Sequence, residues 1–140
     1  MANYTWDVKD CTVIMGGFLI KGFAKDSKAE IERNEDAYML EVGVDGDDTS
    51  RSRSNDKSGK ITLSLMFTSP SNSVLTGFLN ADENDNSGTF DISVSNPALG
   101  LSVSGIDAYI TKQPKLSIKG EAQVIEYVIE VPNMAQGRTA

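Results

Sequence analysis

The segment 61–68 constrains the fold of this chain most strongly, because its side chains change character at every residue. Successive side chains of a strand point to opposite faces of a sheet, so a period of two predicts a strand with one buried face. The two faces divide into an apolar set and a mostly polar set: Ile61, Leu63, Leu65 and Phe67 against Thr62, Ser64, Met66 and Thr68. We expect the second face to meet water or another subunit.

A long polar segment at residues 43–59 precedes this strand. It is too long for a simple turn, and a long irregular segment in a compact domain is usually functional or disordered. Its charges are acidic at the front and mostly basic at the back: Asp45, Asp47, Asp48, Arg51, Arg53, Asp56 and Lys57. Opposite charges suit head-to-tail contacts between identical subunits, so we predict a protruding arm for stacking, with a disordered surface loop as the alternative.

A short helix is predicted after the alternating strand. Ser69 suits the N-cap position and Pro70 the first helical position. Leu75, Phe78 and Leu79 then form part of an apolar stripe that can dock on a sheet. The helix should end near Asp82, because the acidic residues there oppose the helix dipole.

The remaining segments predict further strands, with a hairpin or bulge at Gly16 and Gly17. The expected extended segments are 12–20, 28–44, 89–95, 101–112 and 123–131. We therefore predict a mainly β, antiparallel barrel or sandwich with one short flanking helix and a long protruding loop. Residues 1–140 form a single domain, with a mobile C-terminal tail at about 132–140.

The composition argues against an enzyme and against nucleic-acid binding. The chain has no histidine, one cysteine (Cys11) and a formal net charge of −7. Histidine is the usual general base and a common metal ligand, and phosphate binding requires a basic surface. No signal peptide and no membrane-spanning run of about 18 apolar residues is expected. We predict no catalytic residues, no metal and no cofactor.

Two motifs have ordinary interpretations beside functional ones. Asp82, Asn84 and Asn86 space their oxygens as in a calcium loop, but the required glutamate is replaced by Ser93, so a polar turn is favoured. Tyr4 and Trp6 could stack on a carbohydrate. We favour a staple that docks the N-terminal segment on the domain edge or on a neighbouring subunit.

The chain resembles a family of bacteriophage tail tube proteins from contractile-tailed phages. The resemblance spans nearly the whole chain and is carried by segments 1–7 (MANYTWD), 32–37 (ERNEDA), 51–63 (RSRSNDKSGKITL) and 68–72 (TSPSN). It implies a small β-barrel or sandwich with a flanking helix. Six copies would form a ring whose sheets join into an inner barrel, and the rings would stack into a hollow tube inside a contractile sheath.

The resemblance also implies the partners. These are further copies of the chain, the tail sheath protein, and the baseplate and tail terminator proteins. DNA would pass through the lumen without specific binding, in a virion tail assembled in the host cytoplasm. By alternation, the candidate lumen-facing residues are Glu30, Glu32, Thr62, Ser64 and Thr68. The alternatives are a tube subunit of a bacteriocin or secretion machine, and a monomeric β-sandwich that binds sugar or calcium.

Overall fold

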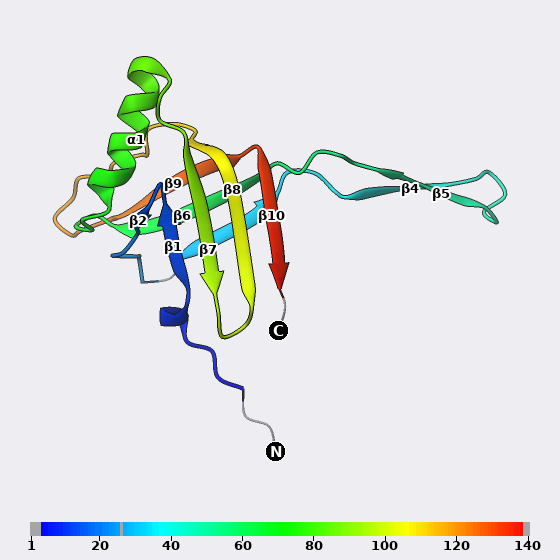
Figure 1. The fold of residues 1–140 in the computed structure, drawn as a ribbon, viewed down its shortest axis with the longest axis horizontal. Helices are drawn as coiled ribbons and strands as arrows, with labels where there is room; N and C mark the ends of the chain where they lie inside the picture. Colours follow the sequence, from blue (N-terminus) through cyan, green and yellow to red (C-terminus); the bar gives the residue numbers. More distant parts are fainter. Residues whose placement is uncertain (1–3, 26, 139–140) are drawn as a thin grey trace.

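The computed structural model describes residues 4–25 and 27–138 and has a mainly β fold (Figure 1). The elements in chain order are η1 (Val8–Asp10), β1 (Thr12–Met15), β2 (Phe18–Leu19), β3 (Ala29–Arg33), β4 (Tyr38–Val42), β5 (Thr49–Arg53), β6 (Gly59–Met66), α1 (Asn72–Asp85), β7 (Phe90–Asn96), β8 (Leu101–Ile110), β9 (Val124–Val131) and β10 (Asn133–Arg138). The predicted antiparallel β architecture with one flanking helix is confirmed. Within the described ranges, no helix is long and apolar enough to span a membrane.

Two antiparallel sheets share one strand. The first sheet runs β2-β1-β7-β8-β10, and the second runs β8-β9-β6-β3. The first half of β8 pairs with β7 and β10, whereas Tyr109 and Ile110 at its end pair with β9. A strand that belongs to both sheets makes a corner, as in barrels and orthogonal sandwiches.

The corner of β8 is shaped by two residues. Asp107 has a left-handed backbone with φ of 56°. Gly105 packs against Val131, so closely that a Cβ on Gly105 would lie 2.2 Å from Val131 Cγ1. The pairing of β7 with β8 also shifts between Phe90 and Ile92, as at a bulge. Bulges and glycines in strands mark such bends.

The tight hairpin predicted at Gly16 and Gly17 is present. Both residues have positive φ values, 56° and 88°, and they join Met15 to Phe18. This geometry is that of a two-residue turn in which glycine avoids a steric penalty.

The apolar face of β6 forms the centre of the core. Ile61, Leu63 and Leu65 are fully buried, in register with Ile129, Tyr127 and Ile125 of β9. Phe67, which alternation places on the same face, lies beyond the end of β6 and is 37 % exposed.

Helix α1 starts later than predicted, at Asn72. The Ser69 hydroxyl donates to the Lys21 carbonyl (2.5 Å), and the Ser71 hydroxyl accepts from the Lys21 amide (2.9 Å). These contacts hold the segment before the helix against a distant part of the chain. The helix continues to Asp85 rather than Asp82, and Asn86 closes it in a left-handed conformation.

The helix packs its apolar stripe into the core. Leu75 and Leu79 are buried, and the ring of Phe78 lies 4.7 Å from that of Phe90 and 6.3 Å from that of Phe18. Figure 1 shows α1 on the side of the sheets away from the hairpin β4–β5. Aromatic pairs at these distances add to the stabilisation from burial.

The prediction of a mobile tail at 132–140 is wrong for residues 133–138, while residues 139–140 lie outside the described ranges. Strand β10 pairs with β8 over six residues. Met134 is fully buried, its carbonyl accepts from Arg33 Nη2 (2.8 Å), and its amide donates to the Lys57 carbonyl (3.0 Å). Pairing with the long edge of β8 and the burial of Met134 in the core order this segment.

A second correction concerns the extended segment 28–44. It divides at residues 34–37 into β3, which joins the second sheet, and β4, which pairs with β5 in a separate two-stranded sheet. The side chain of Asn34 holds this division, donating to Ser58 Oγ (2.9 Å) and Glu130 Oε1 (2.6 Å).

Tyr127→Phe is expected to cost about 0.5–1.5 kcal/mol, the usual net value of one hydrogen bond. The buried Tyr127 hydroxyl donates to Asn72 Oδ1 (3.1 Å) and ties β9 to the start of α1. Chemical denaturation at pH 8, followed by circular dichroism, measures this loss.

The same variant also tests how the ionisation of Tyr127 changes the stability of the fold with pH. Burial raises the pKa of the Tyr127 phenol above its ordinary value of 10.0, opposed by a smaller effect of the Thr76 hydroxyl. The unfolded chain therefore loses this proton first as pH rises past 10, and stability falls over that range. The stability advantage of the parent over Tyr127→Phe should shrink above pH 10; an advantage that stays constant would contradict the assignment.

Candidate functional site

The most prominent surface feature is the hairpin of β4 and β5, here called the arm (residues 38–53). Figure 1 shows that it projects far from the two sheets. Tyr38 pairs with Arg53 and Val42 with Thr49, and the Gly43 amide donates to the Asp48 carbonyl (2.9 Å) to close the turn. The predicted irregular loop is therefore an ordered hairpin that begins before residue 43.

The arm carries large apolar side chains in water. The exposed fractions are 47 % for Tyr38, 69 % for Met39, 73 % for Leu40, 54 % for Val42 and 103 % for Val44. A two-stranded hairpin on its own is marginally stable in water, and exposed apolar clusters mark interaction surfaces. We therefore interpret the arm as a surface that another chain covers.

One face of the arm combines apolar and basic side chains. Tyr38 and Leu40 of β4 lie opposite Arg53 and Arg51 of β5. The guanidinium of Arg51 stacks over the Tyr38 ring at 4.4 Å. Such a contact holds the arginine in place while leaving its donors available to a carboxylate.

The seven charged residues predicted for stacking are all exposed, and the structure separates them by position. Asp45, Asp47 and Asp48 lie in the turn at the tip, Arg51 and Arg53 lie on β5, and Asp56 and Lys57 lie near the base. Hydrogen bonds from Ser58 hold the pKa of Asp56 below its ordinary value. The acidic tip is thus distinct from the basic stem.

The sequence did not predict that the apolar residues of the arm are exposed. The segment 38–42 reads as the continuation of one long strand, because nothing local shows that it leaves the main sheet. The available signal was a second segment of equal length, 49–53, across a turn containing Gly43 and Gly46.

A second candidate surface is the outer face of the second sheet. Four of the five predicted lumen residues share it: Glu30 lies opposite Thr62, Glu32 lies opposite Lys60, and Ser64 follows on β6. Ser64 is 7 % exposed and adds little surface. Thr68 lies beyond the end of β6, in the turn that precedes α1.

This face contains two glutamates that the prediction omitted. Glu130 lies opposite Lys60, and Glu126 lies opposite Ser64. The alternation of β9 carries the signal for both. With Glu30 and Glu32, four carboxylates share the face with Lys60, which makes it acidic at neutral pH.

Besides the two-residue strand β2, which pairs only with β1, two longer sheet edges are open within the described residues. Strand β3 pairs only with β6, and β10 pairs only with β8. An open edge presents unpaired backbone groups that can pair with another chain. The chain therefore offers one long edge on each sheet, β10 and β3, for lateral association.

The two remaining motifs of the sequence are the N-terminal aromatic residues and the acidic turn after α1. Tyr4 is 91 % and Trp6 61 % exposed, and Figure 1 shows their segment leading away from the sheets. Trp6 nevertheless lines a hollow with Ala29 and Val94 of the body, whereas Tyr4 is almost completely exposed. In the turn, the Asp82 carboxylate accepts from the Gly88 amide (3.3 Å), so this oxygen closes the helix end. Among the described residues, no three His, Cys, Asp or Glu side chains are grouped to hold a metal ion.

Comparison with known proteins identifies relatives of this arrangement. The model of the family described as bacteriophage PhiTE tail tube protein matches residues 1–136. No curated protein sequence matches the chain.

Solved structures share the fold at low identity. The tube-terminating cap of the anti-feeding prophage superposes with a TM-score of 0.67 at 15 % identity, over 99 % of this chain and 95 % of that one. The sheath/tube terminator of the extracellular contractile injection system PVC gives 0.66 at 18 %, over 98 % and 99 %. A chain of the PVC sheath-tube complex gives 0.65 at 18 %, over 97 % and 93 %.

Proposed function

Because the chain belongs to the bacteriophage PhiTE tail tube protein family, we propose that it is a tube subunit whose hexameric rings stack into a hollow tube that conducts the phage genome. The family is a structural one and not a class of enzymes. The observation that carries the proposal is the arm, an ordered hairpin with exposed apolar side chains that needs a partner.

Each surface has a place in such an assembly. The open edges of β3 and β10 supply lateral contacts within a ring, since edge pairing satisfies backbone groups that are otherwise unpaired. The arm supplies the contact between rings, with Arg51 and Arg53 meeting carboxylates of the next ring. The acidic face with Glu30 and Glu32 lines the lumen, where it repels phosphate and lets DNA slide.

The partners follow from the same assignment. The sheath protein covers the tube and a terminator protein closes it, roles consistent with the sheath-tube and terminator structures that share the fold. A baseplate nucleates the tube, and assembly takes place in the host cytoplasm before the tail joins the virion.

A tube subunit of a related contractile injection machine is the second candidate, because the solved structures of the same fold come from such machines. The two differ in cargo. Particles isolated with the native protein should contain DNA connected to a capsid in the first case and no capsid in the second.

Negative-stain electron microscopy over a concentration series tests the proposed function. We expect stacked rings or hollow tubes above a critical concentration, because the arm and the sheet edges are covered only in the assembly. A protein that stays monomeric at every concentration, even with its baseplate present, would contradict the proposal.

If the acidic face lines the lumen, its charges should change the rate of DNA release in a way that depends on salt concentration. Glu30→Gln with Glu32→Gln should leave tubes intact and slow DNA release several-fold at low salt, with the difference vanishing above about 0.5 M salt as screening shortens the Debye length. Release from phage particles at several ionic strengths measures it. Glu83→Gln with Asp85→Asn removes the same charge on α1, outside this face, and should change nothing; equal effects of the two pairs would refute the lumen assignment.

A further inference from the structure

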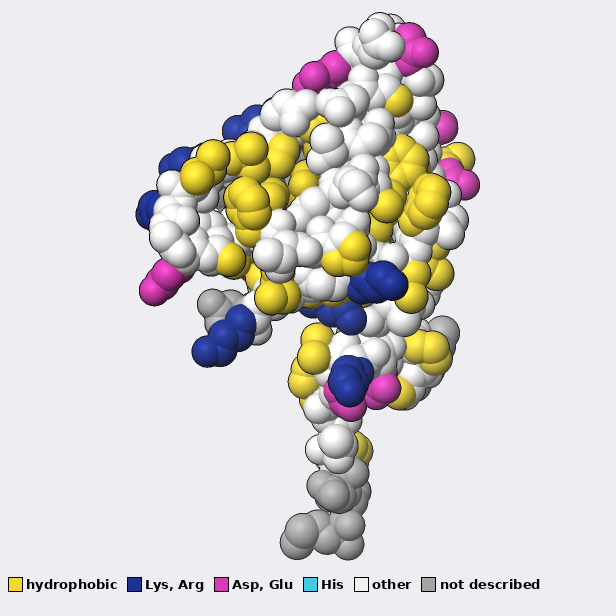
Figure 2. All heavy atoms as spheres, turned by 90° about the vertical axis from the view of Figure 1, so that its left-hand side faces the viewer, with side chains coloured by type: hydrophobic (Ala, Val, Ile, Leu, Met, Phe, Trp, Pro, Cys, Tyr) yellow, Lys and Arg dark blue, Asp and Glu magenta, His cyan; other side chains and the backbone are white. Residues whose placement is uncertain are grey.

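The end of the body opposite the arm carries a second cluster of exposed apolar side chains. We call it the distal patch, and it consists of Met66, Phe67, Leu116, Ile118 and Val124, with exposed fractions of 49, 37, 58, 88 and 52 %. Strand pairing joins Met66 to Val124, and the Phe67 amide donates to the Gln123 carbonyl (3.0 Å). Figure 2, which faces this end, shows apolar atoms gathered beside basic side chains.

The basic side chains come from the connection between β8 and β9, residues 111–123. It contains Lys112, Lys115 and Lys119 and a single acidic residue, Glu121, in a chain whose net charge is −7. Lys112 and Lys115 line a hollow with Val124 of the distal patch and with Glu126, where the acidic face of the second sheet ends. Within residues 4–25 and 27–138, none of the three ammonium groups forms a salt bridge. This end of the molecule is therefore apolar and basic.

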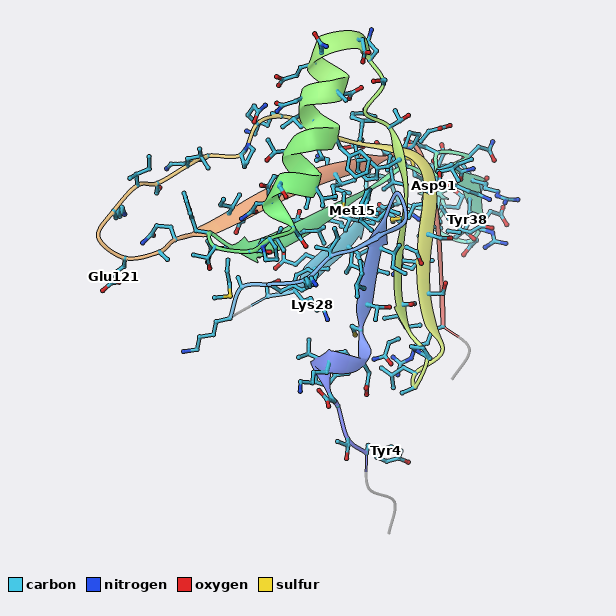
Figure 3. All side chains as sticks on the ribbon, turned by 60° about the vertical axis from the view of Figure 1, so that its left-hand side comes forward. Tyr4, Met15, Lys28, Tyr38, Asp91 and Glu121 are labelled. Carbon is cyan, nitrogen blue, oxygen red and sulfur yellow. The ribbon has the colours of Figure 1, made fainter. Side chains whose placement is uncertain are left out.

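The tip of the arm, at the other end of the molecule, is also apolar but carries the opposite charge. It carries Asp45, Asp47 and Asp48 around the fully exposed Val44. Figure 3 shows Tyr38 at the base of the arm and Glu121 in the β8–β9 connection on opposite sides of the body. One chain thus presents an acidic apolar end and a basic apolar end, facing away from each other.

We propose that the arm of one copy lies on the distal patch of a second copy in the next ring. The Asp45, Asp47 and Asp48 carboxylates then face Lys112, Lys115 and Lys119, and Val44 covers Ile118 and Leu116. This inference rests on the proposed tube function and names the surface that receives the arm. Its physical basis is that both unpartnered surfaces belong to the same chain and are opposite in charge.

The geometry of the contact favours stacking. Two different patches at opposite ends make a heterologous contact, which continues without limit when the copies are related by translation and rotation along one axis. Eight steps of about 3.4 Å separate Tyr38 from Gly46, so the arm extends at most roughly 27 Å from the body towards a neighbouring copy. Complementary charges also fix the direction in which rings add.

Disulfide cross-linking tests the contact directly. Val44→Cys and Ile118→Cys are combined in a Cys11→Ser chain, and preformed tubes are oxidised and run on a denaturing gel. We expect a ladder of covalent multimers that extends past six subunits. Val44→Cys with Ala98→Cys, which places the second thiol in the β7–β8 turn, is the matched control and should give no ladder.

The outcomes separate this inference from the proposed function. Tubes without a ladder, or a ladder that stops at one ring, would overturn the inference while leaving the tube function intact. Failure of the parent chain to form tubes even with its baseplate present would overturn both.

Charge exchange gives an independent readout. Replacing Asp45, Asp47 and Asp48 with lysine, or Lys112, Lys115 and Lys119 with glutamate, should raise the critical concentration for tubes at least tenfold. The combined six-residue variant should recover to within a few-fold of the parent, because the attraction is restored with reversed signs. All six side chains are exposed, so the monomer fold should persist, and absence of recovery in a folded variant would refute the pairing.

Discussion

Leu40→Glu is expected to abolish tube formation at concentrations where the parent assembles completely, while the monomer stays folded. Leu40 is 73 % exposed on the arm and touches solvent before assembly. Covering a leucine side chain contributes about 1.5–3 kcal/mol, and an unpaired carboxylate buried in its place adds a further cost. Because about 1.4 kcal/mol corresponds to a tenfold change, the critical concentration should rise at least ~100-fold.

Sedimentation and electron microscopy measure this change, and Ser52→Glu is the matched control. Ser52 lies on the same hairpin but on the opposite face, next to Met39. It adds the same charge without removing apolar surface from the Leu40 face, so its effect should be much smaller. If both variants assemble like the parent, the apolar face of the arm is not an interface.

Gly105→Ala is expected to destabilise the monomer by about 3 kcal/mol, near the upper end for overpacking a core. The new methyl group would lie 2.2 Å from Val131 Cγ1, and Val131 is itself fully buried. Neither group can move without disturbing the corner where β8 passes between the sheets. The melting temperature should fall by roughly 10 °C.

Val131→Ala provides the partner for a double-mutant cycle. It removes the methyl group that Gly105→Ala would strike, so the double variant should be more stable than the sum of the two single losses predicts. Gly137→Ala is the control, because a Cβ at Gly137 meets nothing within 4 Å. Strict additivity at 105 and 131 would show that the close approach does not limit the packing.

Features set by local chemistry were predictable from the sequence. The alternation of 61–68 identified β6, and Gly16 and Gly17 identified the hairpin of β1 and β2, because period and turn geometry depend on neighbouring residues alone. The expected extended segment 123–131 is strand β9, which lies in the structure between β8 and β6.

Features set by distant contacts were not predictable. Lys21 holds Ser69 and Ser71 and so delays the start of α1, and a core site filled by Met134 orders β10. The departure of β4 from the main sheet also depends on tertiary structure, since Tyr38 to Val42 have the composition of a core strand. The prediction for the arm used only its charged residues. Its apolar residues at 38–42 were placed in the extended segment 28–44 instead.

The attachment of the arm determines how the subunit responds to mechanical load. The arm leaves the body from Arg33 and Gly59, which are paired neighbours at the ends of β3 and β6. A pull on the arm therefore acts along both strands at once, and β6 is bonded on its other side to β9 over eight residue pairs. Backbone hydrogen bonds perpendicular to the strands then share the force in shear and do not break one at a time. A subunit tethered in this way can pass tension to its neighbours while its own sheet remains intact.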